Sequence, residues 1–221
     1  MYEYILAALL GADMTAKQST LFRYVLRVML NIENATIHTF RELMEGSGKY
    51  RDAIERLPFT ARTFMETEFN SREHEQTKRQ VVRRLWGILE NQSFERMFSH
   101  PRSRFDMFAE MNAGKVILIS TAKDLLKQEG AAIFGRFFIA LIAQAAQERA
   151  AVPAARLPCF VYIDECADYL DQNVGVILAQ ARKFNVGMIL AHQYIGQLPP
   201  RLQEGFDANT SIKFVGGVSS T

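Results

Sequence analysis

The chain has 221 residues, of which 48% are hydrophobic and 23% are charged, and its formal net charge is +2. These values are typical of a soluble globular protein with one sizeable core, or a core and a smaller second domain. They exclude a general electrostatic attraction to nucleic acid, so contact with DNA would need a local basic patch. Two cysteines, Cys159 and Cys166, are too few for a disulfide framework or a zinc site, which favours a reducing, cytosolic setting.

No segment is predicted to be a signal peptide or a membrane span. The apolar residues 1–14 form a short run without a basic leader. The longest apolar run, residues 130–146, contains Arg136 and Gln144. It is too short to cross a bilayer, and a buried helix is the better interpretation.

Residues 1–100 are predicted to form an all-α domain, because apolar residues recur at helical intervals and no β-type alternation occurs. Gly46 gives a stop signal for one helix, and a later, long helix is expected to end near Phe98. Three pairs with capping-box spacing mark helix starts: Thr15 with Gln18, Thr39 with Glu42, and Asn70 with Glu73.

The long helix that ends near Phe98 is expected to bury one stripe and expose a basic cluster. The predicted buried stripe consists of Val82, Leu85, Trp86, Leu89 and Phe94. The basic cluster consists of Arg79, Arg83 and Arg84. A solvated helix face is the more common explanation for such a cluster, and contact with DNA is the alternative.

After Pro101 the pattern changes to short apolar runs that alternate with helices. Strands are predicted at 115–121, 159–165, 186–193 and 211–218, and helices at 130–149, at about 172–184 and after Pro199. Strands that are apolar on both faces and alternate with helices indicate a parallel sheet covered on both sides, with right-handed crossovers. The predicted fold class is therefore α/β, with a helical domain at 1–100 and an α/β domain at 101–221.

Polar residues stand at the ends of two of these predicted strands. Asp164 and Glu165 end the strand 159–165, and Gln193 ends the next one. Ligands of parallel sheets bind beyond the carboxyl ends of the strands. An apolar strand that ends in Asp–Glu is the pattern of a Walker B motif, in which the Asp holds Mg²⁺ through water and the Glu orients or deprotonates the attacking water. An acidic residue at the end of a strand, or a glutamine in a loop, often occurs in proteins without a catalytic or metal-binding role.

Arg182 falls in the last turn of the helix predicted between these two strands. A cation at that position suits the helix dipole. A role in phosphate chemistry is the alternative, and the residue alone does not decide between the two.

The four residues together carry a resemblance to a known family. The segment "YIDECADYLDQNVGVILAQARKFNVGMILAHQYIGQLP" (162–199) resembles the Walker B to sensor region of the HerA/FtsK superfamily of P-loop ATPases. It looks most like the conjugative DNA-transfer ATPases, that is, the type IV secretion coupling proteins and their relatives. Residues 203–219 resemble that family's next Asn-containing loop and strand, and the helical half resembles its all-α insertion.

The resemblance implies a RecA-like core, ATP and Mg²⁺ as cofactors, and a hexameric ring that couples ATP hydrolysis to DNA transfer. It implies secretion or relaxosome components as partners. It assigns Mg²⁺ to Asp164 and catalytic roles to Glu165, Gln193 and Arg182, with Gln193 sensing the γ-phosphate and Arg182 acting as an arginine finger. The implied location is cytoplasmic, with any inner-membrane anchor in a region outside this chain.

The sequence departs from the family in one respect: it has no glycine-rich loop that ends in Gly-Lys-Ser/Thr. "EGSGKY" (45–50) contains Gly48–Lys49, but no Ser or Thr follows the lysine, and the segment lies between predicted helices. We therefore expect the carboxyl-side portion of a longer ATPase, a fragment or a split subunit, that is inactive alone. Two alternatives remain: a secretion ATPase that moves protein substrates, and a non-catalytic interaction module whose helical half binds a partner.

Overall fold

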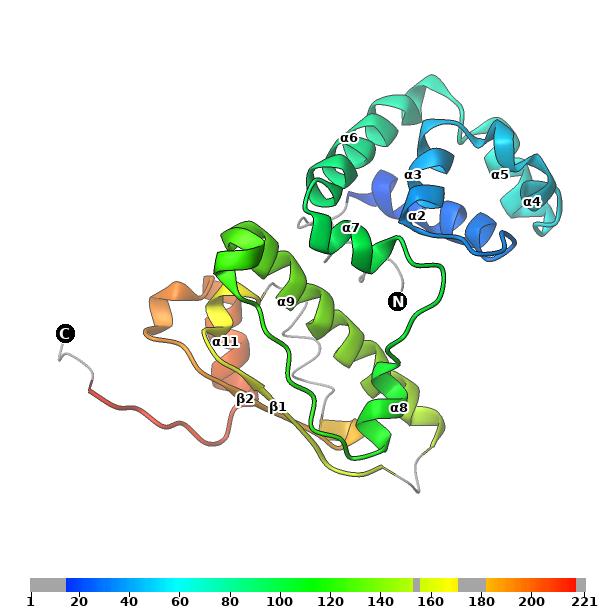
Figure 1. Ribbon diagram of the computed structural model, residues 1–221. Coiled ribbons are helices and arrows are strands. Elements are labelled where there is room, and N and C mark those ends of the chain that lie inside the picture. The colour runs from blue at the N-terminus through cyan, green and yellow to red at the C-terminus, as the bar shows by residue number, and fades with distance from the viewer. Residues whose placement is uncertain (1–14, 153–155, 171–181, 218–221) are drawn as a thin grey trace. The chain divides into compact units, whose positions relative to one another are not determined.

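The structure is a computed structural model that describes residues 15–152, 156–170 and 182–217 (Figure 1). The chain divides into two compact units. The first unit consists of Met1–Asp106 and Ile119–Ala140, and the second of Met107–Leu118 and Leu141–Thr221. Each unit is considered by itself below.

The first unit is built from helices throughout its described residues. They are α2 (Ala16–Met29), α3 (Ile37–Glu45), α4 (Arg51–Glu55), α5 (Phe59–Thr67), α6 (Arg72–Leu89), α7 (Gln92–Phe98) and the first part of α9 (Lys123–Glu148). A 3-10 turn, η1 (Ser47–Tyr50), contains the Gly48–Lys49 pair. This pair therefore lies in a turn between helices, as the sequence predicts.

The capping signals are confirmed in one case and displaced in the other two, since Ser71, one residue after the predicted Asn70, precedes α6. Thr15 caps α2: its hydroxyl accepts from the Gln18 amide at 3.3 Å, and the Gln18 side chain accepts from the Thr15 amide at 3.0 Å. The prediction that Thr39 caps the second helix is wrong, because α3 begins three residues earlier. Thr36 is its cap, with its hydroxyl 3.2 Å from the His38 amide, and Gly46 ends the helix as predicted.

The long helix predicted to end near Phe98 is in fact two helices. α6 follows Ser71 and ends at Leu89, and α7 begins after Asn91. The Asn91 side chain accepts from the Ser93 amide at 2.9 Å, which caps the second helix. An N-cap satisfies one of the four amides that a helix start leaves unpaired, so Asn91 favours a new helix over a continuous one.

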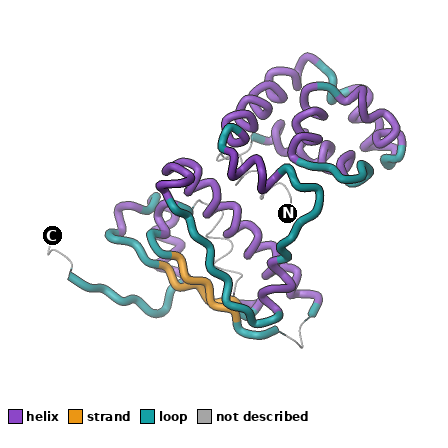
Figure 2. Tube along the Cα trace, viewed as in Figure 1, coloured by secondary structure: helices purple, strands orange, loops and turns teal. Residues whose placement is uncertain are grey.

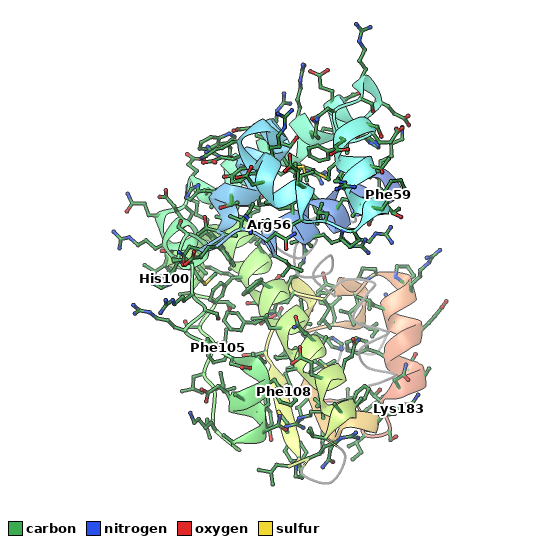
Figure 3. All side chains as sticks on the ribbon, turned by 90° about the vertical axis from the view of Figure 1, so that its right-hand side faces the viewer. Arg56, Phe59, His100, Phe105, Phe108 and Lys183 are labelled. Atoms are coloured by element: carbon green, nitrogen blue, oxygen red, sulfur yellow. The ribbon has the colours of Figure 1, made fainter. Side chains whose placement is uncertain are left out.

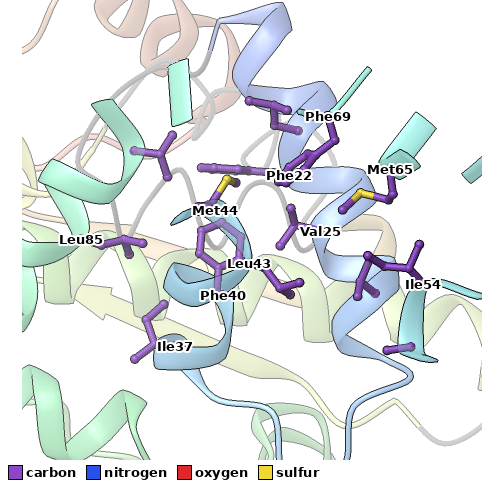
Figure 4. Packing of buried hydrophobic residues seen from close by; sticks show 14 of the residues in the cluster. Phe22, Val25, Ile37, Phe40, Leu43, Met44, Ile54, Met65, Phe69 and Leu85 are labelled. Carbon is purple, nitrogen blue, oxygen red and sulfur yellow. The ribbon is translucent and has the colours of Figure 1, made fainter. Parts of the chain in front are cut away.

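The core of the first unit lies between α2, α3, α5 and α6. Phe22, Phe40, Leu43, Phe69 and Leu85 are all buried completely (Figure 4). The rings of Phe22 and Phe40 meet edge to face at 5.2 Å. Burying a side chain of this kind stabilises the fold by about 1.5–3 kcal/mol, so this cluster is a main source of stability of the unit.

The prediction that Trp86 belongs to the buried stripe of α6 is wrong. Trp86 is 50% exposed, whereas Val81, Leu85 and Ile88 are buried. Val81, Leu85 and Ile88 recur at intervals of four and three and so share one face of the helix, whereas Trp86 directly follows Leu85 and lies about 100° around the helix from it.

The helix predicted at 130–149 is found as α9, which begins earlier, at Lys123, and is interrupted at Lys127, where φ is 59°. Its phenylalanines pack on α7: Phe134 lies 6.2 Å from Phe94 and Phe137 lies 5.0 Å from Phe98, ring centre to ring centre. Among the described residues, this helix is the one long and apolar enough to cross a membrane by length and composition. Core helices of soluble proteins have the same property.

The second unit contains a small parallel sheet. β1 (Cys159–Ile163) and β2 (Val186–Leu190) pair in parallel over their whole length, from Cys159 opposite Val186 to Ile163 opposite Leu190 (Figure 2). Among the described residues of the unit, the other helices are α8 (Met107–Asn112), the end of α9 and α11 (Pro200–Asn209). The 3-10 turns described there are η2 (Arg149–Ala151), η4 (Cys166–Asp168), η5 (Arg182–Phe184) and η6 (Ile195–Gln197). The protein is thus mostly helical, with one parallel strand pair in its described part.

Two predicted strands, 115–121 and 211–218, are not strands within the described residues. Both segments are extended and carry exposed apolar side chains, with Val116 88% and Phe214 95% exposed. A strand forms only where a neighbour supplies ladder hydrogen bonds, and β1 and β2 pair only with each other. The predicted helix at 172–184 lies outside the described residues except for 182–184, which form η5.

Arg149 fixes the amino ends of the two strands. Its side chain is completely buried, and its guanidinium donates to the carbonyl oxygens of Met111 (3.0 Å), Leu157 (3.0 Å) and Phe184 (3.3 Å). These carbonyls belong to α8, to the segment before β1 and to η5. This side chain therefore links the segments from which both strands start to α8.

Candidate active site

The strand pairing continues past the carboxyl ends of β1 and β2. The Ala191 amide donates to the Ile163 carbonyl and the Cys166 amide donates to the Ala191 carbonyl, both at 2.9 Å. The two chain segments that follow the strands, 164–166 and 191–193, are therefore held side by side. The polar residues predicted for a site lie on these two segments.

Glu165 has an unusual backbone conformation for its residue type. Its φ of 49° and ψ of 45° place it in the left-handed helical region, which residues other than glycine seldom adopt. This conformation turns the chain so that Cys166 pairs back onto Ala191, and the Glu165 amide donates to the Asp164 carboxylate at 3.0 Å. Such conformations cost of the order of 1 kcal/mol and are concentrated at functional sites.

The structure brings Glu165 and Gln193 into direct contact. The side-chain amide of Gln193 donates to a carboxylate oxygen of Glu165 at 2.9 Å, from the end of the adjacent strand. Asp164 stands next to this pair and is exposed to solvent. Three of the four predicted site residues therefore meet at one edge of the sheet.

Gln197 is a member of the site that sequence reasoning missed. Its side-chain oxygen accepts from the backbone amides of Gln193 (2.9 Å) and Tyr194 (3.2 Å). It thereby holds the backbone from which the Gln193 side chain extends. The only available signal was a second glutamine four residues after the first, which has no distinctive pattern.

Cys166 follows the acidic pair but does not share its chemistry. The side chain is completely buried, and burial raises the pKa of this thiol from 9.0 to about 11. At neutral pH it is a protonated, unreactive thiol, since only the thiolate is a good nucleophile or metal ligand. The reactive groups of the site are therefore the carboxylates and the amide.

The carboxylate ligands of this site suit a Mg²⁺ ion that keeps most of its waters better than a metal ion bound by several side chains. Within the described ranges, no group of three or more His, Cys, Asp or Glu residues could hold a metal ion. Mg²⁺ does not need such a group, because it keeps several waters and binds through one or two carboxylates together with substrate phosphates. The exposed carboxylate of Asp164 fits that role.

Arg182 does not join the other three residues within the chain. Its backbone begins η5, which precedes β2, whereas Asp164 and Glu165 follow β1. A strand of five residues is about 16 Å long, so the backbone of Arg182 lies at the opposite end of the sheet. The Arg182 side chain is outside the described part of the structure.

The comparisons with known proteins add no relative. The chain matches no protein-family model, no curated protein and no solved structure. The function is therefore argued from the residues of the chain and their geometry.

Proposed function

We propose that the chain is part of a ring-forming, ATP-driven motor of the conjugative DNA-transfer type, in which Asp164, Glu165 and Gln193 form the water-activating half of an ATPase site. One observation carries the proposal: Gln193 and Glu165 form a 2.9 Å hydrogen bond beyond the carboxyl ends of adjacent parallel strands. That edge is where parallel sheets bind their ligands. The Walker B pattern and the "AHQ" strand end supply the residue types that phosphoryl transfer needs.

In the proposed site each residue has its own part in the reaction. Glu165 orients the attacking water and accepts its proton, and the Gln193 amide keeps the carboxylate in place and senses the γ-phosphate. Asp164 holds Mg²⁺ through water, and the ion, when bound, neutralises charge on the phosphates. Gln197 positions Gln193 through its backbone.

Arg182 is proposed to act on the ATP of a neighbouring subunit. Its backbone stands at the opposite end of the strands from Glu165, which suits a role across a subunit interface. A ring of identical subunits joins such opposite surfaces at every interface, and a hexamer is the proposed size. A guanidinium pairs bidentately with phosphate oxygens, so lysine is expected to replace it poorly.

A complete RecA-like sheet is part of the proposal. The extended segments 115–121 and 211–217 have strand-like sequences and exposed apolar side chains such as Val116 and Phe214. Further strands beside β1 and β2 would cover these side chains, and a glycine-rich phosphate loop would complete the site. ATP and Mg²⁺ are the proposed cofactors, and DNA and secretion or relaxosome components are the proposed partners, at a cytoplasmic location.

The test measures ATP hydrolysis by a polypeptide that contains both this chain and a glycine-rich phosphate-binding loop. Glu165→Gln is expected to keep ATP affinity while turnover falls by roughly 100-fold or more, the usual scale of base catalysis. Glu204→Gln is the matched control, because Glu204 is an exposed carboxylate of the same unit outside the site. This chain alone is expected to show no saturable binding of micromolar ATP in calorimetry, since it has no phosphate loop.

Two results would contradict the proposal. Unchanged turnover in Glu165→Gln would make this carboxylate an ordinary strand-end acid. Absence of nucleotide hydrolysis in every polypeptide that contains the chain would favour a non-catalytic interaction module.

A further inference from the structure

The buried face of α6 is polar at its start and apolar further along. Positions three and four residues apart share one face of a helix. On this face they are, in chain order, Ser71, His74, Lys78, Val81, Leu85 and Ile88. His74 and Lys78 are each only 9% exposed, so two basic side chains take core positions that the rest of the helix gives to aliphatic residues. Lysine is almost never buried in this way unless it is paired.

No carboxylate of the described residues forms an ion pair with Lys78. Its ammonium reaches back towards the start of the helix, where it donates to the side-chain oxygen of Asn70 at 3.4 Å and lies 4.5 Å from the centre of the Phe69 ring. Burial lowers the pKa of this ammonium, and Glu75, whose charge acts in the other direction, is itself paired with Arg79. A buried cation without a counter-charge is costly, so this position favours an anion.

The start of α6 adds further unpaired groups. Ser71 precedes the helix without capping it, and its buried hydroxyl oxygen has no hydrogen-bond partner in the described part of the chain. The buried Nδ1 atom of His74 has none there either. Glu73, an acid of the first turn, pairs with Lys17 at 2.7 Å. The first amides of a helix are unpaired and carry the positive end of its dipole, and buried polar atoms normally have partners. Donors without acceptors therefore gather at this helix start.

We propose that the start of α6 binds a small oxyanion of the phosphate class, held by the Lys78 ammonium, the Ser71 hydroxyl and the first backbone amides of the helix. Helix starts bind phosphate because their amides and their dipole both favour negative charge. Hydrogen bonds from a charged donor such as an ammonium are about twice as strong as those between neutral groups. His74 supplies one more donor in the tautomer that carries its proton on Nδ1.

The burial of these groups decides the size of the ligand. Asn70 is exposed, so the site opens to solvent beside the Lys78 ammonium. The polar atoms of Ser71 and His74 are buried, which suits free phosphate or a terminal phosphate group and not a phosphate within a polymer. The inference concerns the first unit only and uses neither ATP nor Asp164. A failure of the ATPase proposal would leave it intact, and the reverse also holds.

The experiment measures thermal unfolding of the full chain at increasing concentrations of inorganic phosphate, with sodium chloride keeping the ionic strength constant. The fluorescence of Trp86, the one tryptophan of the chain and a residue of α6, reports on the first unit. We expect the unfolding midpoint to rise with phosphate, since a ligand that binds only the folded state stabilises it. A second series with glycerol phosphate separates the two sources of the ligand: the larger rise shows whether the site takes the free anion or a terminal phosphate group.

Lys78→Met is expected to weaken phosphate binding about tenfold or more, because one charged donor is lost. Without phosphate, the midpoint of this variant is expected to equal or exceed that of the wild type, because a buried charge without a partner is removed. Ser71→Ala is a second variant that carries the test if Lys78→Met does not fold. Its hydroxyl has no hydrogen-bond partner in the described part of the chain, so the change is mild, and phosphate binding is expected to weaken about threefold or more.

The matched control is Arg56→Met, which removes one positive charge at an exposed position of the same unit (Figure 3). It is expected to respond to phosphate as the wild type does. The inference is overturned if Lys78→Met and Ser71→Ala respond to phosphate as Arg56→Met does. It is also overturned if phosphate raises the wild-type midpoint no more than sodium chloride of equal ionic strength, since the chain would then respond to screening alone.

Discussion

Arg149 is a completely buried arginine whose acceptors are backbone carbonyls. Within the described residues it has no acidic partner, and it donates to Met111, Leu157 and Phe184. Hydrogen bonds from a charged donor contribute about 1.5–3 kcal/mol, and a carbonyl left unpaired in the interior costs a comparable amount. Arg149 is therefore an important source of stability at the amino ends of the strands of the second unit.

We predict that Arg149→Met lowers the free energy of unfolding of the second unit by about 3 kcal/mol, since three carbonyls lose a charged donor and one of these hydrogen bonds, to Met111, is buried. Urea unfolding followed by circular dichroism measures the change. Arg156→Met is the control, because Arg156 also donates to three carbonyls, of Arg149, Ala150 and Lys183, but is only partly buried. Equal losses in the two variants would show that burial of the guanidinium does not matter.

Cys166 makes stability depend on pH in the alkaline range. Burial raises its pKa from 9.0 to about 11, so the folded protein holds this proton more tightly than the unfolded chain does. The resulting stabilisation is fully present below about pH 9 and is lost as pH rises towards 11. We predict a steeper loss of stability between these values in the wild type than in Cys166→Ala, measured by urea unfolding at a series of pH values. Identical pH profiles would contradict this.

At the scale of elements, helix starts could be predicted only where one capping pattern stood alone. Thr15 with Gln18 had no competitor, and the structure confirms it. Near the second helix, Thr36 and Thr39 both have capping potential, and Thr36 is the cap because residues 37–40 continue the buried stripe through Ile37 and Phe40. The break at Asn91 was hidden because the apolar spacing continues across it to Phe94.

We predict that Thr36→Ala destabilises the first unit by about 1 kcal/mol, the usual cost of removing an N-cap side chain. Thermal or urea unfolding gives the value. Thr63→Ala is the control: its hydroxyl bonds to the Phe59 carbonyl inside α5, so alanine there is expected to be neutral or slightly stabilising. A larger loss in Thr63→Ala would contradict this assignment of the cap.

The strand-end residues of the site could be predicted because parallel pairing is a general rule. Adjacent parallel strands bring their carboxyl ends to one edge of the sheet. The sequence analysis predicted from this rule that Asp164, Glu165 and Gln193 lie together. Gln197 could not be predicted in this way, because a glutamine that accepts from backbone amides of a loop belongs to no repeating sequence pattern. The segments 115–121 and 211–217 have strand sequences without strand structure, because strand formation depends on a neighbour that a local pattern cannot identify.

At the scale of the whole molecule, the two units obtain their stability from different sources. The first has a continuous cluster of completely buried residues, including Phe22, Phe40 and Leu85. The second combines a two-stranded sheet with exposed apolar side chains, and isolated two-stranded sheets are marginally stable. We therefore expect the free energy of unfolding of the second unit to be lower than that of the first.

Hydrogen exchange measured by mass spectrometry tests this expectation peptide by peptide. Amides of α2, α3 and α6 are predicted to be the most protected, and those of β1 and β2 to exchange through an opening that does not expose the first unit. Two variants make the test specific. Phe40→Leu, a conservative core change that costs roughly 1 kcal/mol, should lower protection in the first unit only. Arg149→Met should lower it in the second unit only. If either variant lowers protection to the same extent in α3 and β2, the two units unfold as one cooperative body and the division is wrong.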